Sequence, residues 1–131
     1  SLIVDGHHLP GSTVKAMVRA NGEGRTILVT DAIAAAGCAP GRFALGGVEC
    51  ELREDGRVAL PGSPYLAGSA LTMDKAIANT VRFTGLSIAQ AVMMASTIPA
   101  AYLGEAPAGT VTADWDEARH ELRIVGVSSD H

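Results

Sequence analysis

The sequence predicts an α/β protein that begins with a parallel β-α-β unit and carries an antiparallel insertion after it. Residues 2–4 and 26–30 are continuous apolar runs of the length that buried strands have. Between them, apolar residues recur at helical spacing across residues 13–20, and an Asn-Gly pair follows. A strand, a helix and a strand in this order predict a parallel pair of strands.

The pattern changes to short alternating runs after the second apolar strand. Residues 42–45, 48–53 and 57–60 are separated by Gly-Gly and Asp-Gly dipeptides, which tolerate the positive φ angles of hairpin turns. In the middle run, apolar residues alternate with charged ones, as they do in a strand with one buried face. The sequence therefore predicts an antiparallel β meander at about residues 42–60.

Helical periodicity returns in the second half of the chain. Residues 69–83 predict one helix, and Ser87 with Gln90 three residues later forms a capping box that opens a second. Pro99 is expected to stop or kink the second helix, with one further turn at residues 100–103. Two final strands are expected at residues 110–115 and 121–127.

Composition and charge restrict the class of protein. The chain has 131 residues, of which 47% are apolar, so it is globular but too short for a complete (β/α)₈ barrel of about 250 residues. A net charge of −4 argues against a nucleic-acid binder, and no apolar run approaches the roughly 20 residues that span a bilayer. Cys38 and Cys50 have no disulfide or zinc-site spacing, so we expect free thiols and a cytoplasmic location.

Two aspartates follow the predicted parallel strands. Asp5 and Asp31 each come directly after an apolar run. Because α/β proteins place their sites beyond the carboxyl ends of such strands, both carboxylates are expected at the mouth of a pocket. An aspartate at this position is also a common loop or helix cap, and position alone leaves both roles open.

A histidine pair and a loop of small residues are further candidates. His7 and His8 follow the first strand, and hydrogen bonding to the local backbone is their simplest role. Adjacent histidines point in different directions, which disfavours a shared metal ion, whereas a neutral imidazole suits a sugar hydroxyl or a polarised carbonyl. Residues 66–68 lead into Ser69, and their backbone N–H groups either approach an anionic ligand or simply precede a helix capped by Ser69.

Four motifs occur in a fixed order along the chain. They are Val-Asp-Gly-His-His at 4–8, Leu-Val-Thr-Asp-Ala at 28–32, Leu-Ala-Gly-Ser-Ala-Leu-Thr-Met-Asp at 66–74 and Met-Ala-Ser-Thr-Ile-Pro-Ala at 94–100. Together they resemble the last third of the N-acetylglucosamine-6-phosphate deacetylases of the amidohydrolase superfamily, from residue 2 to about residue 104. The resemblance implies that residues 1–104 form the last two β/α units of a (β/α)₈ barrel, interrupted by the meander. Residues 105–131 would then supply strands of a small β-domain.

The resemblance also implies an activity and the residues that carry it. Such enzymes hydrolyse N-acetylglucosamine 6-phosphate to glucosamine 6-phosphate and acetate, with a divalent metal ion, zinc or similar, held by earlier strands. Asp31 then matches the general base and acid that moves a proton from water to the leaving amine. The substrate-binding residues implied are Asp5, Gly6, His7, His8, Leu66, Ala67 and Gly68, with no metal ligand in this chain.

Several expectations follow about what the chain does alone. Because it opens directly on an apolar strand, we expect an N-terminal half to be missing, and with it the metal ligands. The chain alone is then expected to bind no metal, to be inactive, and to associate with that half or as a homo-oligomer. A phosphorylated amino sugar is the expected ligand, and neither nucleic acid nor a membrane is an expected partner. The alternatives are another metal-dependent amidohydrolase, for example dihydroorotase-like, or a non-catalytic assembly module.

Overall fold

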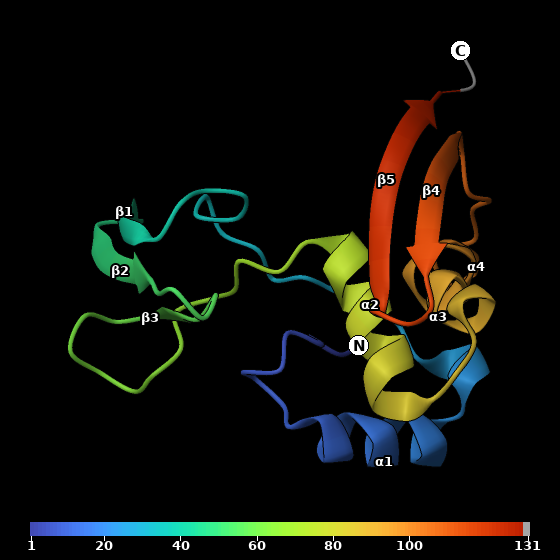
Figure 1. Ribbon diagram of the computed structural model, residues 1–131, viewed down its shortest axis with the longest axis horizontal. Helices are drawn as coiled ribbons and strands as arrows, with labels where there is room; N and C mark the ends of the chain where they lie inside the picture. The colour runs from blue at the N-terminus through green and yellow to red at the C-terminus, as the bar shows by residue number, and fades with distance from the viewer. Residues whose placement is uncertain (130–131) are drawn as a thin grey trace. The chain divides into compact units, whose positions relative to one another are not determined.

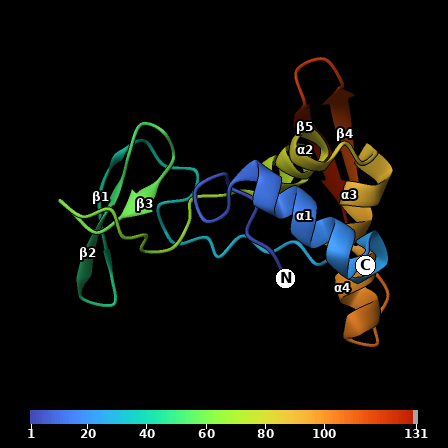
Figure 2. The same ribbon diagram turned by 90° about the horizontal axis from the view of Figure 1, so that it is seen from below.

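The computed structural model describes residues 1–129, apart from the side chain of residue 23, and divides into two compact units. The first unit contains Ser1–Val29 and the chain from Met73 onward, and the second contains Thr30–Thr72. The α-helices and β-strands of both are labelled in Figures 1 and 2. Helices and antiparallel sheets make the chain a small α/β protein, as the sequence predicts.

Helices form most of the core of the first unit. They are α1 (Gly11–Asn21), the short 3₁₀ helix η1 (Glu23–Arg25), α2 (Met73–Thr84), α3 (Ile88–Ala95) and α4 (Thr97–Tyr102). Helix α2 packs against both α1 and α3. Its Ile77 and Val81, spaced i and i+4, face the core, as do Val14 and Val18 of α1. None of the helices in residues 1–129 is both long and apolar enough to cross a membrane.

The predicted parallel strands form only one isolated bridge. Leu2 pairs with Leu28 in parallel, through bonds from Leu2 N to Ile27 O at 2.8 Å and from Val29 N to Leu2 O at 3.0 Å. The N–H of Leu28 instead donates to the carbonyl of Met94 in α3, at 3.0 Å. The parallel direction was therefore predicted correctly, but the pairing stops at one bridge and neither segment is an extended strand.

The helix boundaries differ from the prediction at two places, Ser69 and the segment before Pro99. Helix α2 begins at Met73 and not at Ser69, so Ser69 is not its cap. The capping box of Ser87 and Gln90 at the start of α3 is confirmed. The expected interruption near Pro99 occurs, because α3 ends at Ala95 and the short α4 begins at Thr97. Pro99 itself lies in the first turn of α4, where the backbone N–H that proline lacks has no partner within that helix.

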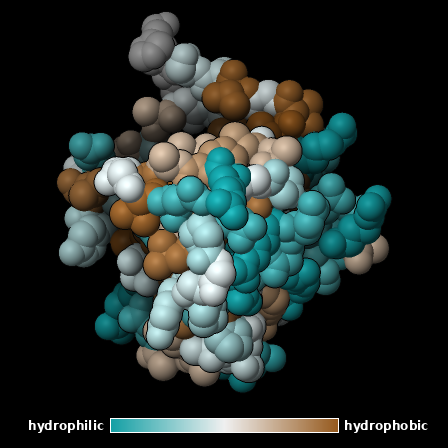
Figure 3. All heavy atoms as spheres, turned by 90° about the vertical axis from the view of Figure 1, so that its left-hand side faces the viewer, coloured by the Kyte–Doolittle hydropathy of each residue, from teal (hydrophilic) through white to brown (hydrophobic). Residues whose placement is uncertain are grey.

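A β-hairpin ends the first unit. Strands β4 (Thr110–Asp116) and β5 (Glu121–Ser128) pair antiparallel, with a bulge between Thr112 and Ala113. Trp115 and Leu122 pack against the helical core, but Val111 and Val127 are 59% and 75% exposed. Figure 3 shows strongly hydrophobic atoms near the C-terminal end of this hairpin. The two strands were predicted to within one residue at each end.

The second unit contains the predicted antiparallel meander. Strands β1 (Gly41–Leu45), β2 (Val48–Leu52) and β3 (Val58–Ala59) lie in that order. The expected alternation holds for the buried Cys50 and Leu52 of β2, whereas Val48 is 53% exposed because it lies at the hairpin turn. Cys50, Leu52, Ala35 and Val58 form the core of this unit. Both cysteines are free thiols, as expected from their spacing.

Candidate functional site

Asp31 has an unusual backbone conformation for a residue other than glycine. Its φ is +52°, in the left-handed region, and its side chain is exposed. Such conformations are uncommon in non-glycine residues, and they persist only where surrounding contacts hold them. An aspartate that combines an exposed carboxylate with a constrained backbone is a candidate functional residue.

Ser69 supplies the contacts that hold the backbone around Asp31. Its N–H donates to the Asp31 carbonyl at 3.1 Å, and its own carbonyl accepts from the N–H of Ile33 at 2.9 Å. The Ser69 hydroxyl donates to the carbonyl of Thr30 and accepts from the N–H of Leu71. Ser69 is only 1% exposed, so these bonds are shielded from water. We call this arrangement the Ser69 clamp.

The clamp brings two of the sequence motifs together in the second unit. Ala32 and Ser69 form a parallel bridge, which places the Val-Thr-Asp-Ala segment beside the Leu-Ala-Gly-Ser loop. Leu66 forms an antiparallel bridge with Ala59 of β3, and the N–H of Ala67 donates to Val58 O at 3.0 Å. The backbone N–H groups of Ala67 and Ser69 are therefore bonded within the unit. These two N–H groups are therefore already used inside the unit, and of the loop's donors they are not the ones that would meet an anionic ligand.

Gly68 fits between Asp31 and Ile33 because it has no side chain. Its φ is +101°, and a Cβ built on it would lie 2.6 Å from Cγ2 of Ile33 and 3.7 Å from the carbonyl oxygen of Asp31. The contact with Ile33 is closer than real Cβ atoms come to other atoms, whereas the one with Asp31 is ordinary. Both the backbone angle and the space require glycine, and the close approach keeps the loop against the Asp31 segment.

Asp5 and His8 form a second candidate group, in the first unit. One carboxylate oxygen of Asp5 accepts the N–H of His7 at 2.8 Å and the N–H of His8 at 2.9 Å. The other oxygen lies 2.7 Å from Nδ1 of His8. Gly6 permits this tight loop with a φ of +80°. The side chain of Asp5 is 9% exposed and that of His8 is 22% exposed.

The pKa of Asp5 results from two opposing effects. Burial raises it, because a charged carboxylate loses its solvation, while the hydrogen bonds from the N–H groups of His8 and His7 and from the His8 ring lower it. The hydrogen bonds outweigh burial, so the pKa of Asp5 lies below its ordinary value of 3.8. Asp5 is therefore ionised at neutral pH.

The described residues do not fit a metal site. Across residues 1–129, no group of three or more histidine, cysteine, aspartate or glutamate side chains could hold a metal ion. Asp5 and His8 are engaged with each other, and Asp31 contacts its surroundings through its backbone. No chemical step in this chain is therefore assigned to a metal held by these residues.

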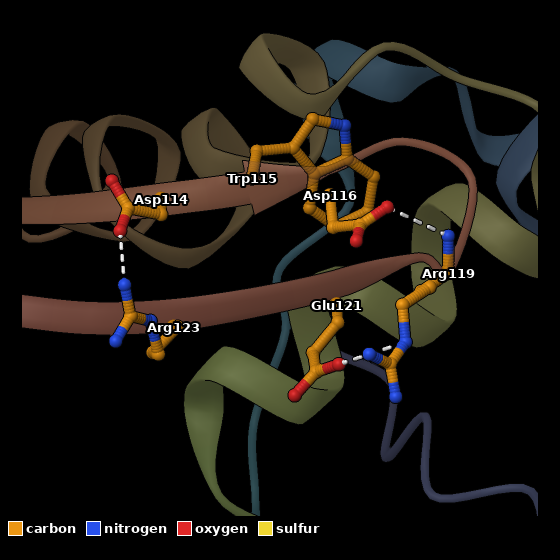
Figure 4. A pocket seen from close by; sticks show the side chains of 6 residues that line it. All are labelled: Asp114, Trp115, Asp116, Arg119, Glu121 and Arg123. Carbon is orange, nitrogen blue, oxygen red and sulfur yellow. Dashed lines mark hydrogen bonds and ion pairs between the residues drawn. The ribbon is translucent and has the colours of Figure 1, made fainter.

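Two surface hollows of the first unit are lined by residues of the β4–β5 hairpin. One, of about 330 Å³, is formed by charged residues of the β4–β5 hairpin around Trp115 (Figure 4). Its charges are exposed and paired with one another, with Arg123 2.6 Å from Asp114 and Arg119 3.6 Å from Glu121. The other is an apolar groove of about 530 Å³ between α2, α3 and the hairpin. Neither contains a residue that the motifs predict to be functional.

The sequence did not single out Ser69 as a functional residue. We expected it to begin a helix, because a serine before an apolar run is a common cap. The signal that was available is the four-residue string Leu-Ala-Gly-Ser, whose Gly68 and Ser69 contact Asp31 although they follow it by 37 and 38 positions. Leu66, Ala67 and Gly68 do lie together with Asp31 in the second unit, while Asp5, Gly6, His7 and His8 lie in the first.

Known proteins similar to this chain share one enzyme class. The curated homologues of this chain and its structural neighbours are deacetylases of N-acetylglucosamine 6-phosphate or N-acetylgalactosamine 6-phosphate. No protein-family model matches the chain. The resemblance that the four motifs indicate is therefore confirmed by independent matches across most of the chain.

Individual relatives give the extent of the similarity. The chain is 42% identical over 103 residues to the N-acetylgalactosamine-6-phosphate deacetylase of Escherichia coli O157:H7, which covers 79% of this chain and 26% of the relative. It is 36% identical over 103 residues to the N-acetylglucosamine-6-phosphate deacetylase of Vibrio furnissii, covering 79% of this chain and 25% of the relative. The chain thus spans about a quarter of the length of these two relatives.

Solved structures match over nearly the whole chain. The N-acetylglucosamine-6-phosphate deacetylase of Thermotoga maritima has a TM-score of 0.82 and 30% identity, covering 98% of this chain and 36% of that protein. The Mycobacterium smegmatis enzyme, as a variant with one aspartate replaced by alanine and in complex with N-acetyl-D-glucosamine 6-phosphate, has a TM-score of 0.83 and 27% identity. That match covers 98% of this chain and 35% of the Mycobacterium protein.

Proposed function

We propose that this chain supplies the catalytic aspartate and part of the substrate site of an amino-sugar-6-phosphate deacetylase. The reaction is hydrolysis of the N-acetyl amide, which yields acetate and the free amine of the sugar phosphate. The observation that carries the proposal is the exposed carboxylate of Asp31 on a left-handed backbone held by the Ser69 clamp. The names and structures of the relatives support the reaction.

Asp31 has two tasks in this proposal. Its carboxylate accepts a proton from the attacking water as the C–O bond forms, and it then gives that proton to the amine nitrogen as the C–N bond breaks. A proton carrier must stay in one place between the two transfers. The three hydrogen bonds between Ser69 and the backbone of residues 30–33 support this, since they fix the residue while its side chain stays exposed.

The remaining parts of the intact enzyme are proposed to lie outside this chain. A divalent metal ion, zinc or similar, would be held by residues that this sequence does not contain, because the described residues do not form a metal site. We also propose that residues 1–104 are the last two β/α units of a (β/α)₈ barrel and that the β4–β5 hairpin joins a small β-domain. The match to the Thermotoga maritima structure across 98% of the chain supports this arrangement.

The identity of the sugar has two candidates. The motifs favour N-acetylglucosamine 6-phosphate, the substrate named for the relatives of Vibrio furnissii and Homo sapiens. The higher identity, 42%, is to a deacetylase named for N-acetylgalactosamine 6-phosphate, against 36% and 38% for the others. These sugars differ only in the configuration at one ring carbon, so residues that contact ring hydroxyls decide between them. The second sugar is therefore the specific alternative.

A chimera tests the proposal in a complete enzyme. This chain replaces the aligned region of the Escherichia coli O157:H7 relative, and acetate release is measured with both sugar phosphates. General acid–base catalysis contributes about 10²–10⁴-fold, so Asp31→Asn is expected to lower kcat at least about 100-fold, with metal content and Tm unchanged. Asp55→Asn is the control in the same unit, because Asp55 is exposed and its carboxylate accepts the N–H of Arg57 in a surface turn, a bond that an asparagine carbonyl can also accept.

Two results would refute the proposal. A folded, metal-loaded chimera without activity on either sugar would reject the function. An Asp31→Asn chimera with near-normal kcat would show that this carboxylate is a loop cap and not the proton carrier. The chain by itself, assayed with added zinc, is expected to release no acetate above a metal-only control.

A further inference from the structure

The loop of residues 5–8 contains a carboxylate, that of Asp5, which is almost fully buried. Asp5 was expected to contact substrate, yet its side chain is only 9% exposed and both of its oxygens accept hydrogen bonds within the loop. The imidazole of His8 is the more exposed member of the pair, at 22%. The arrangement thus places His8 toward the outside and Asp5 behind it.

We propose that Asp5 is a positioning residue that holds His8 in the tautomer with hydrogen on Nδ1, so that Nε2 is the nitrogen presented to a ligand. The inference deepens the proposed function, because it assigns the ligand-contacting atom within the predicted substrate loop.

The direction of the hydrogen bond carries the argument. A carboxylate that is ionised has only acceptors, and Asp5 is ionised at neutral pH because its pKa lies below the ordinary value. At 2.7 Å, Nδ1 of His8 must therefore donate to Asp5. In the neutral ring the other nitrogen, Nε2, is then an acceptor with a free lone pair. That atom suits a hydroxyl donor, which is the chemistry that a sugar presents.

The surrounding structure fixes the pair in place. The side-chain amide of Asn79 in α2 donates to the carbonyl of Val4 at 2.9 Å, and Val4 itself is fully buried. The backbone before Asp5 is thus anchored to a helix of the core, and the two N–H groups that Asp5 accepts close the loop after it. His8 cannot turn its ring without breaking its bond to this anchored carboxylate.

Asp5→Asn separates a positioning role from simple loop closure. The asparagine carbonyl can still accept the N–H groups of His7 and His8, so the loop keeps its shape. Its amide NH₂, however, donates toward Nδ1 of His8 and therefore favours the tautomer with hydrogen on Nε2. The same isosteric exchange, with loss of the required tautomer, is known for the aspartate of the serine-protease triad.

Nitrogen NMR of the 15N-histidine-labelled chain provides the test. At a pH where His8 is neutral, the wild-type chain is expected to show protonated Nδ1, and Asp5→Asn is expected to show protonated Nε2. A hydrogen bond to a charged group biases the populations by about 10- to 100-fold. His120, which contacts Trp115 on the hairpin, is the internal control, and its signals should not change. A His8→Gln chain identifies the His8 signals.

The outcomes distinguish this inference from the proposed function. Protonated Nε2 in the wild-type chain, or the same tautomer in both chains, would overturn the role of Asp5 whatever the enzyme does. In the active chimera, Asp5→Asn is expected to raise KM about 10-fold or more with a smaller change in kcat. An unchanged KM despite a switched tautomer would overturn the claim that Nε2 contacts the substrate. A chimera that is inactive in the wild-type form would refute only the proposed function.

Discussion

Replacing Ser69 with alanine removes the hydroxyl from the clamp while leaving its backbone unchanged. The hydroxyl donates to the carbonyl of Thr30 and accepts the N–H of Leu71, and Leu71 is only 6% exposed. A buried polar group without a partner costs about 1–3 kcal/mol. The Leu71 N–H, left without a partner in the interior, should cost near the upper end of this range. The Thr30 carbonyl should cost less, because Thr30 is half-buried and water can reach it. We therefore expect a total of about 2–4 kcal/mol.

Hydrogen exchange measures this loss where it occurs. The Ile33 amide donates to the backbone carbonyl of residue 69, and this bond is also possible with alanine at that position. Its exchange rate therefore reports on the stability of the clamp. A loss of 2–4 kcal/mol corresponds to about a 30- to 1,000-fold faster exchange. Ser63→Ala is the matched control, because the Ser63 hydroxyl also accepts a backbone N–H, that of Tyr65, but at the exposed surface. It should change the exchange of Ile33 less than about 3-fold.

The reasoning would be refuted by equal effects of the two serine substitutions. The hydroxyl of Ser69 would then contribute no more than a surface hydroxyl, and the left-handed backbone of Asp31 would have to be held by the two backbone bonds alone. In the active chimera, Ser69→Ala is expected to lower kcat without changing the pH at which activity is half-maximal. Its effect is on where the carboxylate lies, and the carboxylate itself is unaltered.

Two further predictions concern glycine and pH. Gly68→Ala adds a left-handed strain of about 1–2 kcal/mol and a contact with Ile33 that costs about 1–3 kcal/mol. Gly47→Ala, at φ +82° in open space, adds only the strain. Urea unfolding should therefore show a larger loss of unfolding free energy for Gly68→Ala, and equal losses would contradict the close approach. Because the pKa of Asp5 is lower in the folded state than its ordinary 3.8, its contribution to stability is present above that pH and is lost as the pH falls through the folded value. The difference in free energy of unfolding between wild type and Asp5→Asn should therefore shrink below about pH 4, and a constant difference down to about pH 2 would refute the pKa direction.

Local patterns in the sequence predicted most of the elements. The i, i+4 spacing of Ile77 and Val81, the capping box at Ser87 and the Gly-Gly and Asp-Gly turns of the meander each depend on neighbouring residues only. Such signals need no knowledge of the rest of the fold. The helix start that was wrong, at Ser69, and the break that lies before Pro99 are at residue types that suit two local structures.

Contacts between distant segments could not be read from the sequence. The left-handed φ of Asp31 depends on Ser69, which is 38 positions later, and the N–H of Leu28 donates to Met94 in another element. Motif resemblance indicated that Asp31 and residues 66–68 belong to one site, but it did not indicate that Ser69 joins them. The role of Asp5 likewise depended on knowing that its side chain is buried behind His8.

The Ser69 clamp also determines how the second unit tolerates changes in length. It ties residues near the start of Thr30–Thr72 to residues near its end, so the meander between them is a closed loop with a hydrogen-bonded base. Doubling the length of a closed flexible loop costs only about 0.6 kcal/mol of chain entropy. Insertions at the β1–β2 turn are therefore expected to leave the geometry at Asp31 nearly unchanged, whereas loss of β2 or β3 would remove Cys50, Leu52 and Val58 from the core of the unit.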